Sequence, residues 1–149
     1  MPSNNNLKKS SSRLISVQIL YEMEINGKSF ELISKRFSKE YFAEIMSSKN
    51  SVMPDKNYIK HIVKGVSLYQ KKIDIVINEN LKKWSLPRID SLARAILRSA
   101  VYELLSPNDV PDKVVFNEYI EISKLFFSAD EPSFINGILD TIANKDYKL

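Results

Sequence analysis

The stretch from Ile89 to Leu104, IDSLARAILRSAVYEL, decides the fold class of this chain. Its apolar residues recur at helical spacing and would line one face of an amphipathic helix. Comparable stripes run from Ile59 to Ile73 and from Val115 to Phe126. The chain of 149 residues contains only three glycines, which argues against an architecture rich in turns and strands. The sequence therefore predicts an all-α protein.

Two further helices are predicted upstream of this stretch. From about Ser10 to Glu24 the chain is apolar on most sides, as a mostly enclosed helix should be. A second helix from Phe30 to Ile45 ends in a polar loop, 47–56, which is the best candidate for disorder. Downstream, Pro111 is typical of a helix start, and Asp130 could cap the last helix. We expect six or seven helices.

Composition narrows the class of protein. With 44% hydrophobic and 27% charged residues, the chain has the profile of a single globular domain over 1–149, and we expect 1–9 to form a flexible basic tail. No apolar run approaches the roughly 20 residues of a membrane helix, and the N-terminus lacks the pattern of a secretory signal. The absence of cysteine fits a reducing compartment. We therefore expect a cytoplasmic protein.

Little in the sequence supports catalysis. His61 is the single histidine and there is no cysteine, so a site built from several histidines or from thiolates is excluded. Three isolated glycines cannot form the common phosphate-binding loops. Paired carboxylates such as Glu118 and Glu121 are typical of a solvated helix face. We expect no enzyme, no cofactor and no metal site, and we interpret His61 as a residue of a surface or helix edge.

The N-terminal cations and Phe134 each allow two interpretations, one functional and one purely structural. The net charge is +4, and Lys8, Lys9 and Arg13 meet no acidic residue in the first twenty positions. These cations could contact phosphates of a nucleic acid, or they could simply solubilise a tail. Phe134 follows a predicted loop, where its ring could stay accessible for base stacking, or it could pack inward near Ile138.

Three motifs follow one another in the C-terminal third: Arg94-Ala-Ile-Leu-Arg98, Tyr102-Glu103-Leu104 and Asp109-Val110-Pro111. In this order they resemble the NusB family of transcription antitermination factors. The next helix of the family looks like Val114-Val115-Phe116-Asn117-Glu118 followed by Ile120-Glu121-Ile122-Ser123-Lys124, and its closing motif is similar to Phe134-Ile135-Asn136-Gly137-Ile138-Leu139-Asp140. In the first helix, Val17-Gln18-Ile19-Leu20-Tyr21 resembles the family pattern, so the likeness spans nearly the whole chain.

The resemblance implies an all-helical fold of two packed subdomains and a function in RNA binding. Proteins of this family bind the boxA element of nascent ribosomal RNA as a heterodimer with the small-subunit ribosomal protein NusE, within the antitermination complex of RNA polymerase. Relatives can also form homodimers in the free state. The RNA-binding residues that the resemblance and the charge pattern imply are Lys8, Lys9, Arg13, Gln18, Tyr21, Arg98, Asp130 and Phe134. We expect the cations and Phe134 to lie on one outer surface.

The chain departs from the family pattern at two places. Serines 10–12 stand where the family carries an arginine-rich segment, and Ser133 stands where a lysine is usual. A glycine-containing loop of the family appears here as Phe127-Ser128-Ala129. These differences predict lower RNA affinity and leave open a second class of function, a scaffold that binds NusE with weak or no RNA binding. A third, a domain serving an RNA-modifying methyltransferase, would need a catalytic domain for which 149 residues leave no room.

Overall fold

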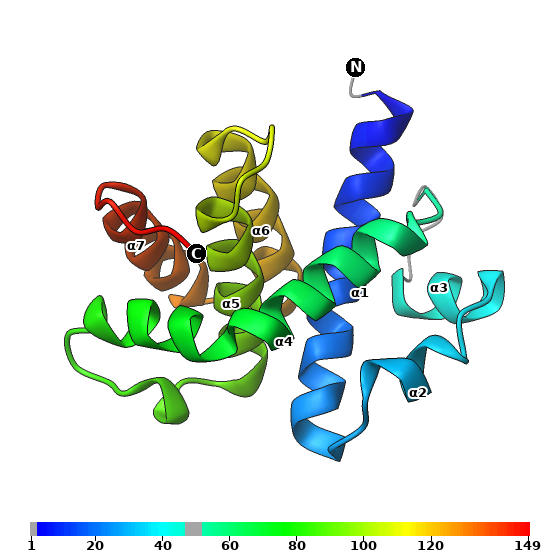
Figure 1. The fold of residues 1–149 in the computed structure, drawn as a ribbon, viewed down its shortest axis with the longest axis horizontal. Helices are drawn as coiled ribbons and strands as arrows, with labels where there is room; N and C mark the ends of the chain where they lie inside the picture. The colour runs from blue at the N-terminus through cyan, green and yellow to red at the C-terminus, as the bar shows by residue number, and fades with distance from the viewer. Residues whose placement is uncertain (1–2, 47–51) are drawn as a thin grey trace.

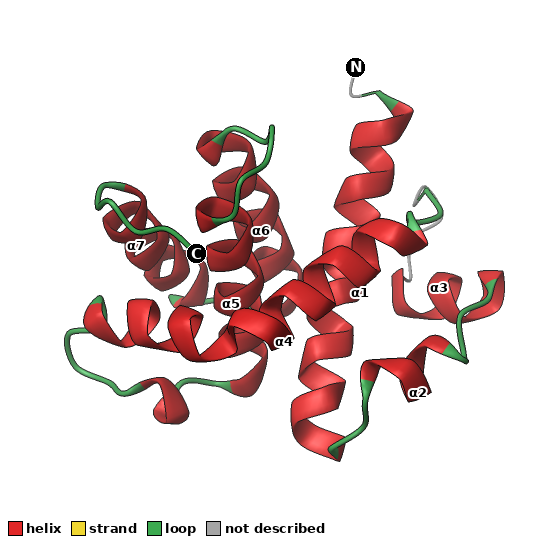
Figure 2. Ribbon diagram, in the orientation of Figure 1, coloured by secondary structure: helices red, strands yellow, loops and turns green. Residues whose placement is uncertain are grey.

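The computed structural model describes residues 3–46 and 52–149, and within these ranges all regular structure is helical (Figure 2). The helix α1, Asn4–Asn26, begins where the Ser3 hydroxyl accepts a hydrogen bond from the amide of Asn6. It ends at Gly27, whose φ of 67° is the left-handed conformation that glycine adopts without steric cost. Positions 4–9, which we expected to form a flexible tail, therefore belong to the first helix.

The segment that we predicted as one helix from Phe30 to Ile45 forms two, α2 (Phe30–Ser34) and α3 (Lys39–Met46). The Ser38 hydroxyl accepts a hydrogen bond from the amide of Tyr41 at 3.1 Å and so starts a new helix. The break also lets Phe37 lie against the rings of Phe30 and Phe42, at centroid distances of 6.1 and 5.0 Å. The loop expected to be disordered lies partly outside the described residues, and α4 begins at its last residue, Lys56.

The remaining helices follow the predicted stripes. They are α4 (Lys56–Glu79), the short 3₁₀ helix η1 (Leu86–Arg88), α5 (Ser91–Leu105), α6 (Asp112–Phe126) and α7 (Glu131–Ala143). Asp55 caps α4 and Asp90 caps α5 through hydrogen bonds from backbone amides of the first turn. The helix start predicted at Pro111 is confirmed by α6.

Two hydrophobic clusters divide the molecule into packed helical subdomains. The smaller one joins α2 and α3 to α1 and the N-terminal half of α4, through Ile15, Ile33 and Ile59 among others. The larger one surrounds α5 and includes α6, α7 and the rest of α4. In Figure 1, α4 crosses α1, with α2 and α3 on one side and α5 to α7 on the other. The predicted all-α fold of two packed subdomains is thereby confirmed.

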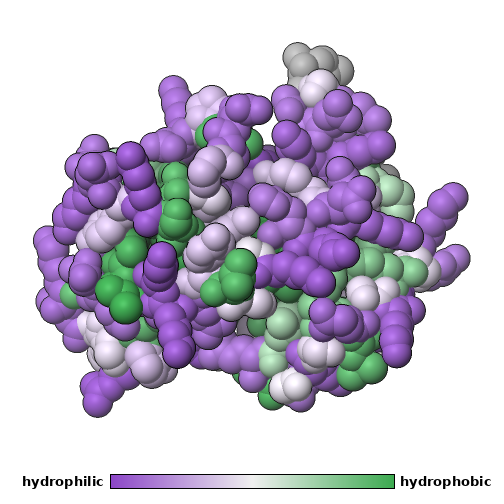
Figure 3. Space-filling view, in the orientation of Figure 1, coloured by the Kyte–Doolittle hydropathy of each residue, from purple (hydrophilic) through white to green (hydrophobic). Residues whose placement is uncertain are grey.

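One face of the molecule is largely hydrophilic (Figure 3). Apolar atoms gather on it in patches, one over α2 and α3 and another over α7 and the C-terminal end. Large exposed apolar side chains include Leu68, Trp84 and Leu125. In the described part of the chain, no helix combines the length and hydropathy needed to cross a membrane.

Candidate nucleic-acid interface

Arg13 lies in the interior, at the centre of a group of five polar side chains. Its Nε is 2.8 Å from Oε2 of Glu103, and its Nη1 is 2.7 Å from Oε1 of Glu118. Its Nη2 donates to Oε1 of Glu103 and to the hydroxyl of Tyr58, both at 3.2 Å. The hydroxyls of Tyr58 and Tyr119 donate to the two oxygens of Glu103. We call Arg13, Tyr58, Glu103, Glu118 and Tyr119 the Arg13 network.

Burial and charge act together on this network. The side chains of Arg13 and Glu103 are only 2% and 3% exposed. Both charges are therefore desolvated, and their pairing offsets the cost of burying them. Burial by itself lowers the pKa of Arg13, but the hydrogen bonds and negative charge of Glu103 outweigh it and raise that pKa. Burial and the Glu103 carboxylate raise the pKa of both Tyr58 and Tyr119. The network therefore holds one guanidinium, the two carboxylates that pair with it, and two neutral phenols.

The predicted RNA contact by Arg13 is wrong for this structure. Its guanidinium donates four hydrogen bonds to two carboxylates and a phenol, and almost none of the side chain reaches the surface. The sequence showed no acidic residue near Arg13, but Glu103 and Glu118 approach it from α5 and α6, ninety and more positions away. Arg13 thus ties α1 to α5 and α6, and its role is structural.

The two N-terminal lysines remain near the surface. Lys8 and Lys9 are half-buried on the first turns of α1. The ammonium of Lys9 lies 5.6 Å from the ring centroid of Tyr58, within the range of a cation–π interaction. Among the described residues neither lysine has an ion-pair partner, so both could contact an anion.

Gln18 and Tyr21 lie in a different place, the cleft between α1 and α3. The cleft has a volume of about 610 Å³, and its other lining residues include Arg36 and Tyr41. Arg36 pairs with Glu22 at 2.7 Å, and its guanidinium carbon is 5.6 Å from the ring centroid of Tyr41. The positive charge of Arg36, which the sequence analysis did not identify, therefore lies beside Gln18 and Tyr21.

Arg98 is held by carboxylates in a third place, a cleft bounded by α1, α4 and α5. Its Nε and Nη2 donate to the two oxygens of Asp74 at 2.8 and 2.9 Å, and Glu24 lies 3.7 Å from its Nη1. This fork geometry is the preferred one for an arginine and a carboxylate. An RNA contact by Arg98 stays a prediction, and it would require exchange of these partners.

Asp130 and Phe134 lie together at the start of α7. Both line a cleft of about 350 Å³ that also includes Trp84 and Glu131. The Phe134 side chain is 38% exposed, so the prediction that its ring is accessible is confirmed. Asp130 stands at the N-cap position, but its side chain makes no capping hydrogen bond, contrary to our expectation. Asp130 therefore lines the cleft and leaves the start of α7 without a side-chain cap.

The predicted RNA-binding residues thus do not gather in one compact patch of the surface. The Lys9 ammonium contacts Tyr58 in the first turn of α4, while Phe134 shares a cleft with Asn80 at the end of that helix. At 1.5 Å per residue, Tyr58 and Asn80 are separated by about 33 Å along α4. An RNA strand that reached both ends would have to be long.

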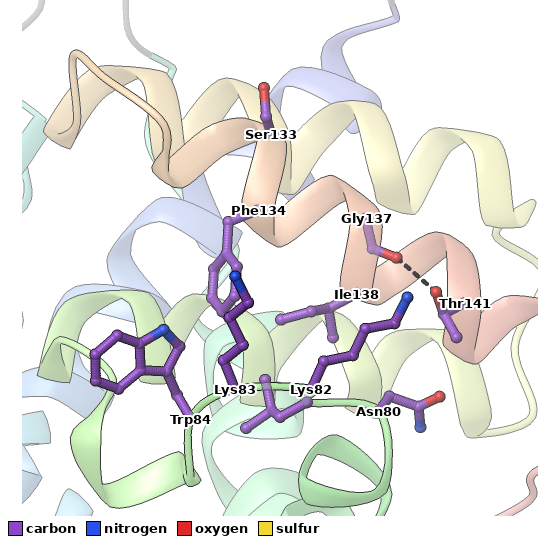
Figure 4. Close-up of a pocket in the computed structure, with 10 residues that line it drawn as sticks. Asn80, Lys82, Lys83, Trp84, Ser133, Phe134, Gly137, Ile138 and Thr141 are labelled. Atoms are coloured by element: carbon purple, nitrogen blue, oxygen red, sulfur yellow. Dashed lines mark hydrogen bonds between the residues drawn. The ribbon is translucent and has the colours of Figure 1, made fainter.

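A second cleft beside Phe134 has a volume of about 460 Å³. It is lined by three further residues from the loop between α4 and η1 that the sequence did not indicate, namely Lys82, Lys83 and Trp84. Figure 4 shows the Phe134 ring and the Trp84 indole at this cleft, with both lysines extending from the loop toward α7. The one available signal was the single tryptophan of the chain, placed outside every helical stripe and directly after two lysines.

Two further expectations were that the chain has no metal site and that His61 lies at a surface or helix edge. Among residues 3–46 and 52–149, no group of three or more metal-ligating side chains is found. His61 is exposed on α4, and its ring lies 5.4 Å from that of Tyr102. The interpretation of His61 as a surface residue is confirmed.

Comparisons with known proteins agree with this fold. The model of the NusB family matches residues 10–144. The transcription antitermination protein NusB of Caulobacter vibrioides is 39% identical over 144 residues, which cover 96% of this chain and 97% of that protein. Crystalline NusB of T. maritima superposes with a TM-score of 0.69 and 30% identity, covering 92% of this chain and 91% of the other.

A third similar structure contains a complex. The antitermination factors NusB and NusE, crystallised with double-stranded RNA, give a match with a TM-score of 0.69 and 23% identity, covering 91% of this chain and 96% of the matched chain. At that identity the match concerns the fold. The family consists of transcription antitermination factors and is not an enzyme family. The chain described here belongs to the NusB family of transcription antitermination factors.

Proposed function

We propose that this protein binds boxA-type single-stranded RNA in nascent ribosomal RNA transcripts, together with a NusE-type ribosomal protein, and so supports ribosomal RNA transcription and maturation by RNA polymerase. The membership of the chain in the NusB family supports the proposal. A structural neighbour that was crystallised with NusE and RNA supports the choice of partners. The observation that carries it is the accessible ring of Phe134, a platform on which an unpaired base can stack.

The remaining contacts of this proposal come from the predicted residues that the structure leaves accessible. Lys8 and Lys9 would contact phosphates, while Gln18, Tyr21 and Asp130 would form hydrogen bonds with base edges. Arg13 is not among them, because its charge is already neutralised by carboxylates in the interior.

A salt titration with labelled RNA tests the proposal. Each phosphate contact to a single strand contributes about −0.7 to the slope of log affinity against log salt concentration, so two N-terminal lysines predict a contribution of about −1.4. Binding should be measured with boxA-type RNA, with a scrambled strand and with a duplex, each in the presence of the NusE-type protein. Equal affinity for the scrambled strand, or affinity independent of salt, would contradict the proposal.

A second candidate function is a scaffold that binds a NusE-type protein with little RNA affinity. The burial of Arg13 favours it, since one of the three N-terminal cations cannot reach a phosphate. A pull-down with the purified NusE-type protein distinguishes the two. Tight partner binding, together with RNA association that Lys9→Ala and Phe134→Ala leave unchanged, would favour the scaffold.

A further inference from the structure

The cleft between residues 80–84 and α7 combines aromatic and aliphatic walls with two lysines. We call it the Trp84 cleft, lined by Asn80, Leu81, Lys82, Lys83, Trp84, Ser133, Phe134, Gly137, Ile138 and Thr141. Its volume of about 460 Å³ lies in the usual range of small-molecule sites. Aromatic and aliphatic side chains form its walls, and the two lysines stand at its opening (Figure 4).

Two aromatic rings are left in solvent at this cleft. The Trp84 side chain is 56% exposed and that of Phe134 is 38% exposed. Both rings also line the neighbouring cleft at the start of α7, so they stand at the boundary between the two hollows. Every nucleobase can stack on such a ring, because each base has a flat π-face.

The lysines beside these rings are free to bind an anion. In the described part of the chain, neither Lys82 nor Lys83 has a carboxylate within ion-pair distance, and both side chains are exposed. Two cations of α5, Arg94 and Arg98, are by contrast neutralised by Glu24 and Asp74. A phosphate that reached the Trp84 cleft would therefore meet two uncompensated positive charges.

We propose that the Trp84 cleft binds one unpaired nucleotide of a single-stranded RNA, with its base stacked on Trp84 and its flanking phosphates at Lys82 and Lys83. The inference rests on the proposed RNA-binding function and deepens it. It adds a stacking residue and two phosphate contacts to the accessible ring of Phe134.

The neighbouring cleft gives the bound strand a direction. Its lining includes three carboxylates, those of Asp90, Asp130 and Glu131, and one arginine, Arg88. This excess of negative charge would repel a phosphate. An amino group on the edge of an adjacent base could donate to one of the carboxylates. The backbone of the strand would therefore follow the lysines, and its base edges would point toward the neighbouring cleft.

The single tryptophan makes the proposal directly measurable. The probe is a boxA-type single-stranded RNA of about twelve nucleotides, carrying a label whose anisotropy reports binding anywhere on the protein. Trp84 emission is followed in the same titration, because Trp84 is the only tryptophan of the chain. We expect stacking to quench this emission and to saturate at the same RNA concentration as the anisotropy.

Matched variants separate the contributions of ring and charge. Trp84→Ala should weaken binding about 5- to 150-fold, the equivalent of one lost stacking contact, and Trp84→Phe should restore much of it. The double variant Lys82→Ala/Lys83→Ala should make the salt slope shallower by about 1.4. The control Lys71→Ala/Lys72→Ala removes the same charge from exposed positions of α4 and should leave the slope unchanged.

Failure of this inference and failure of the proposed function look different. If the anisotropy rises while Trp84 emission and the affinity of Trp84→Ala stay unchanged, RNA binds elsewhere and the nucleotide site is wrong. If the control variant at 71 and 72 makes the salt slope as shallow as the variant at 82 and 83 does, the contribution of Lys82 and Lys83 is nonspecific. Their assignment as phosphate contacts is then wrong. If the anisotropy does not rise even with the NusE-type protein present, both the function and the site are contradicted.

Discussion

The Arg13 network and the Trp84 cleft place positive charge in opposite surroundings. In the network, the Arg13 side chain is 2% exposed, and its guanidinium faces two carboxylates and a phenol. In the cleft, Lys82 and Lys83 are exposed beside two aromatic rings and have no acidic partner among the described residues. Positive charge therefore serves the fold at Arg13 and is available to a ligand at Lys82 and Lys83.

The difference follows from the two side chains. A guanidinium offers five donors in a fixed plane, which matches the carboxylates of Glu103 and Glu118 and the hydroxyl of Tyr58 at once. A lysine ammonium is strongly hydrated and has a flexible stem, so it remains in water until a phosphate replaces that water. The comparison predicts that substitutions in the network act on stability and that substitutions in the cleft act on binding.

The largest expected effect is that of Arg13→Ala. It leaves Glu103 buried without its counter-ion, which typically costs about 3–5 kcal/mol in the free energy of unfolding. Urea denaturation followed by circular dichroism measures this change. The double variant Arg13→Met/Glu103→Leu removes both charges and should recover much of the loss. A loss below about 1 kcal/mol for Arg13→Ala would contradict a structural role.

The second prediction concerns the alkaline stability of the fold. The pKa of Tyr119 is raised by burial and by Glu103, so the folded protein keeps a proton that the unfolded chain releases above about pH 10. The unfolded state then binds fewer protons than the folded one, and the free energy of unfolding falls as pH rises. The fall amounts to about 1.4 kcal/mol per pH unit for each such tyrosine.

Denaturation of the wild type and of Tyr119→Phe between neutral pH and pH 11 checks this slope. The variant lacks one titrating phenol, so its stability should fall less steeply above pH 10, although it starts lower because Glu103 loses a donor. Lysine titration affects both proteins equally. Parallel curves for the two proteins would mean that the phenol ionises as easily in the folded state as in the unfolded one.

The sequence predicts the helices of this protein better than it predicts the Arg13 network or the Trp84 cleft. The helices and the two subdomains were predictable, because helical spacing of apolar residues reports local structure directly. Exposure of Phe134 was open on spacing alone, since the same position allows packing near Ile138. The burial of Arg13 was not predictable locally, because Glu103 and Glu118 lie about ninety and more positions away and reach it only through helix packing. Lys82 and Lys83 were missed because a loop carries no periodic signal.

A third prediction compares ion pairs of different exposure. Arg36 pairs with Glu22 at 2.7 Å, the same distance as Arg13 from Glu118, but its side chain is 43% exposed. Arg36→Ala should therefore cost no more than about 1 kcal/mol in the free energy of unfolding, because water screens the pair. A cost comparable with that of Arg13→Ala would show that exposure does not separate the two arginines.

The smallest expected effect on stability is that of Trp84→Ala, and this substitution decides whether the cleft is a binding site or a part of the core. Trp84 is 56% exposed, so removal of its ring should change the free energy of unfolding by no more than about 0.5 kcal/mol. Urea denaturation supplies the measurement, with Leu97→Ala in the buried part of α5 as a reference of about 2–5 kcal/mol. A large loss of stability in Trp84→Ala would place the ring in the core, and weaker RNA binding by that variant would then reflect misfolding. A near-zero change together with weaker RNA binding would separate the functions of the two regions, since the Arg13 network would hold the helices together and the Trp84 cleft would contact the ligand.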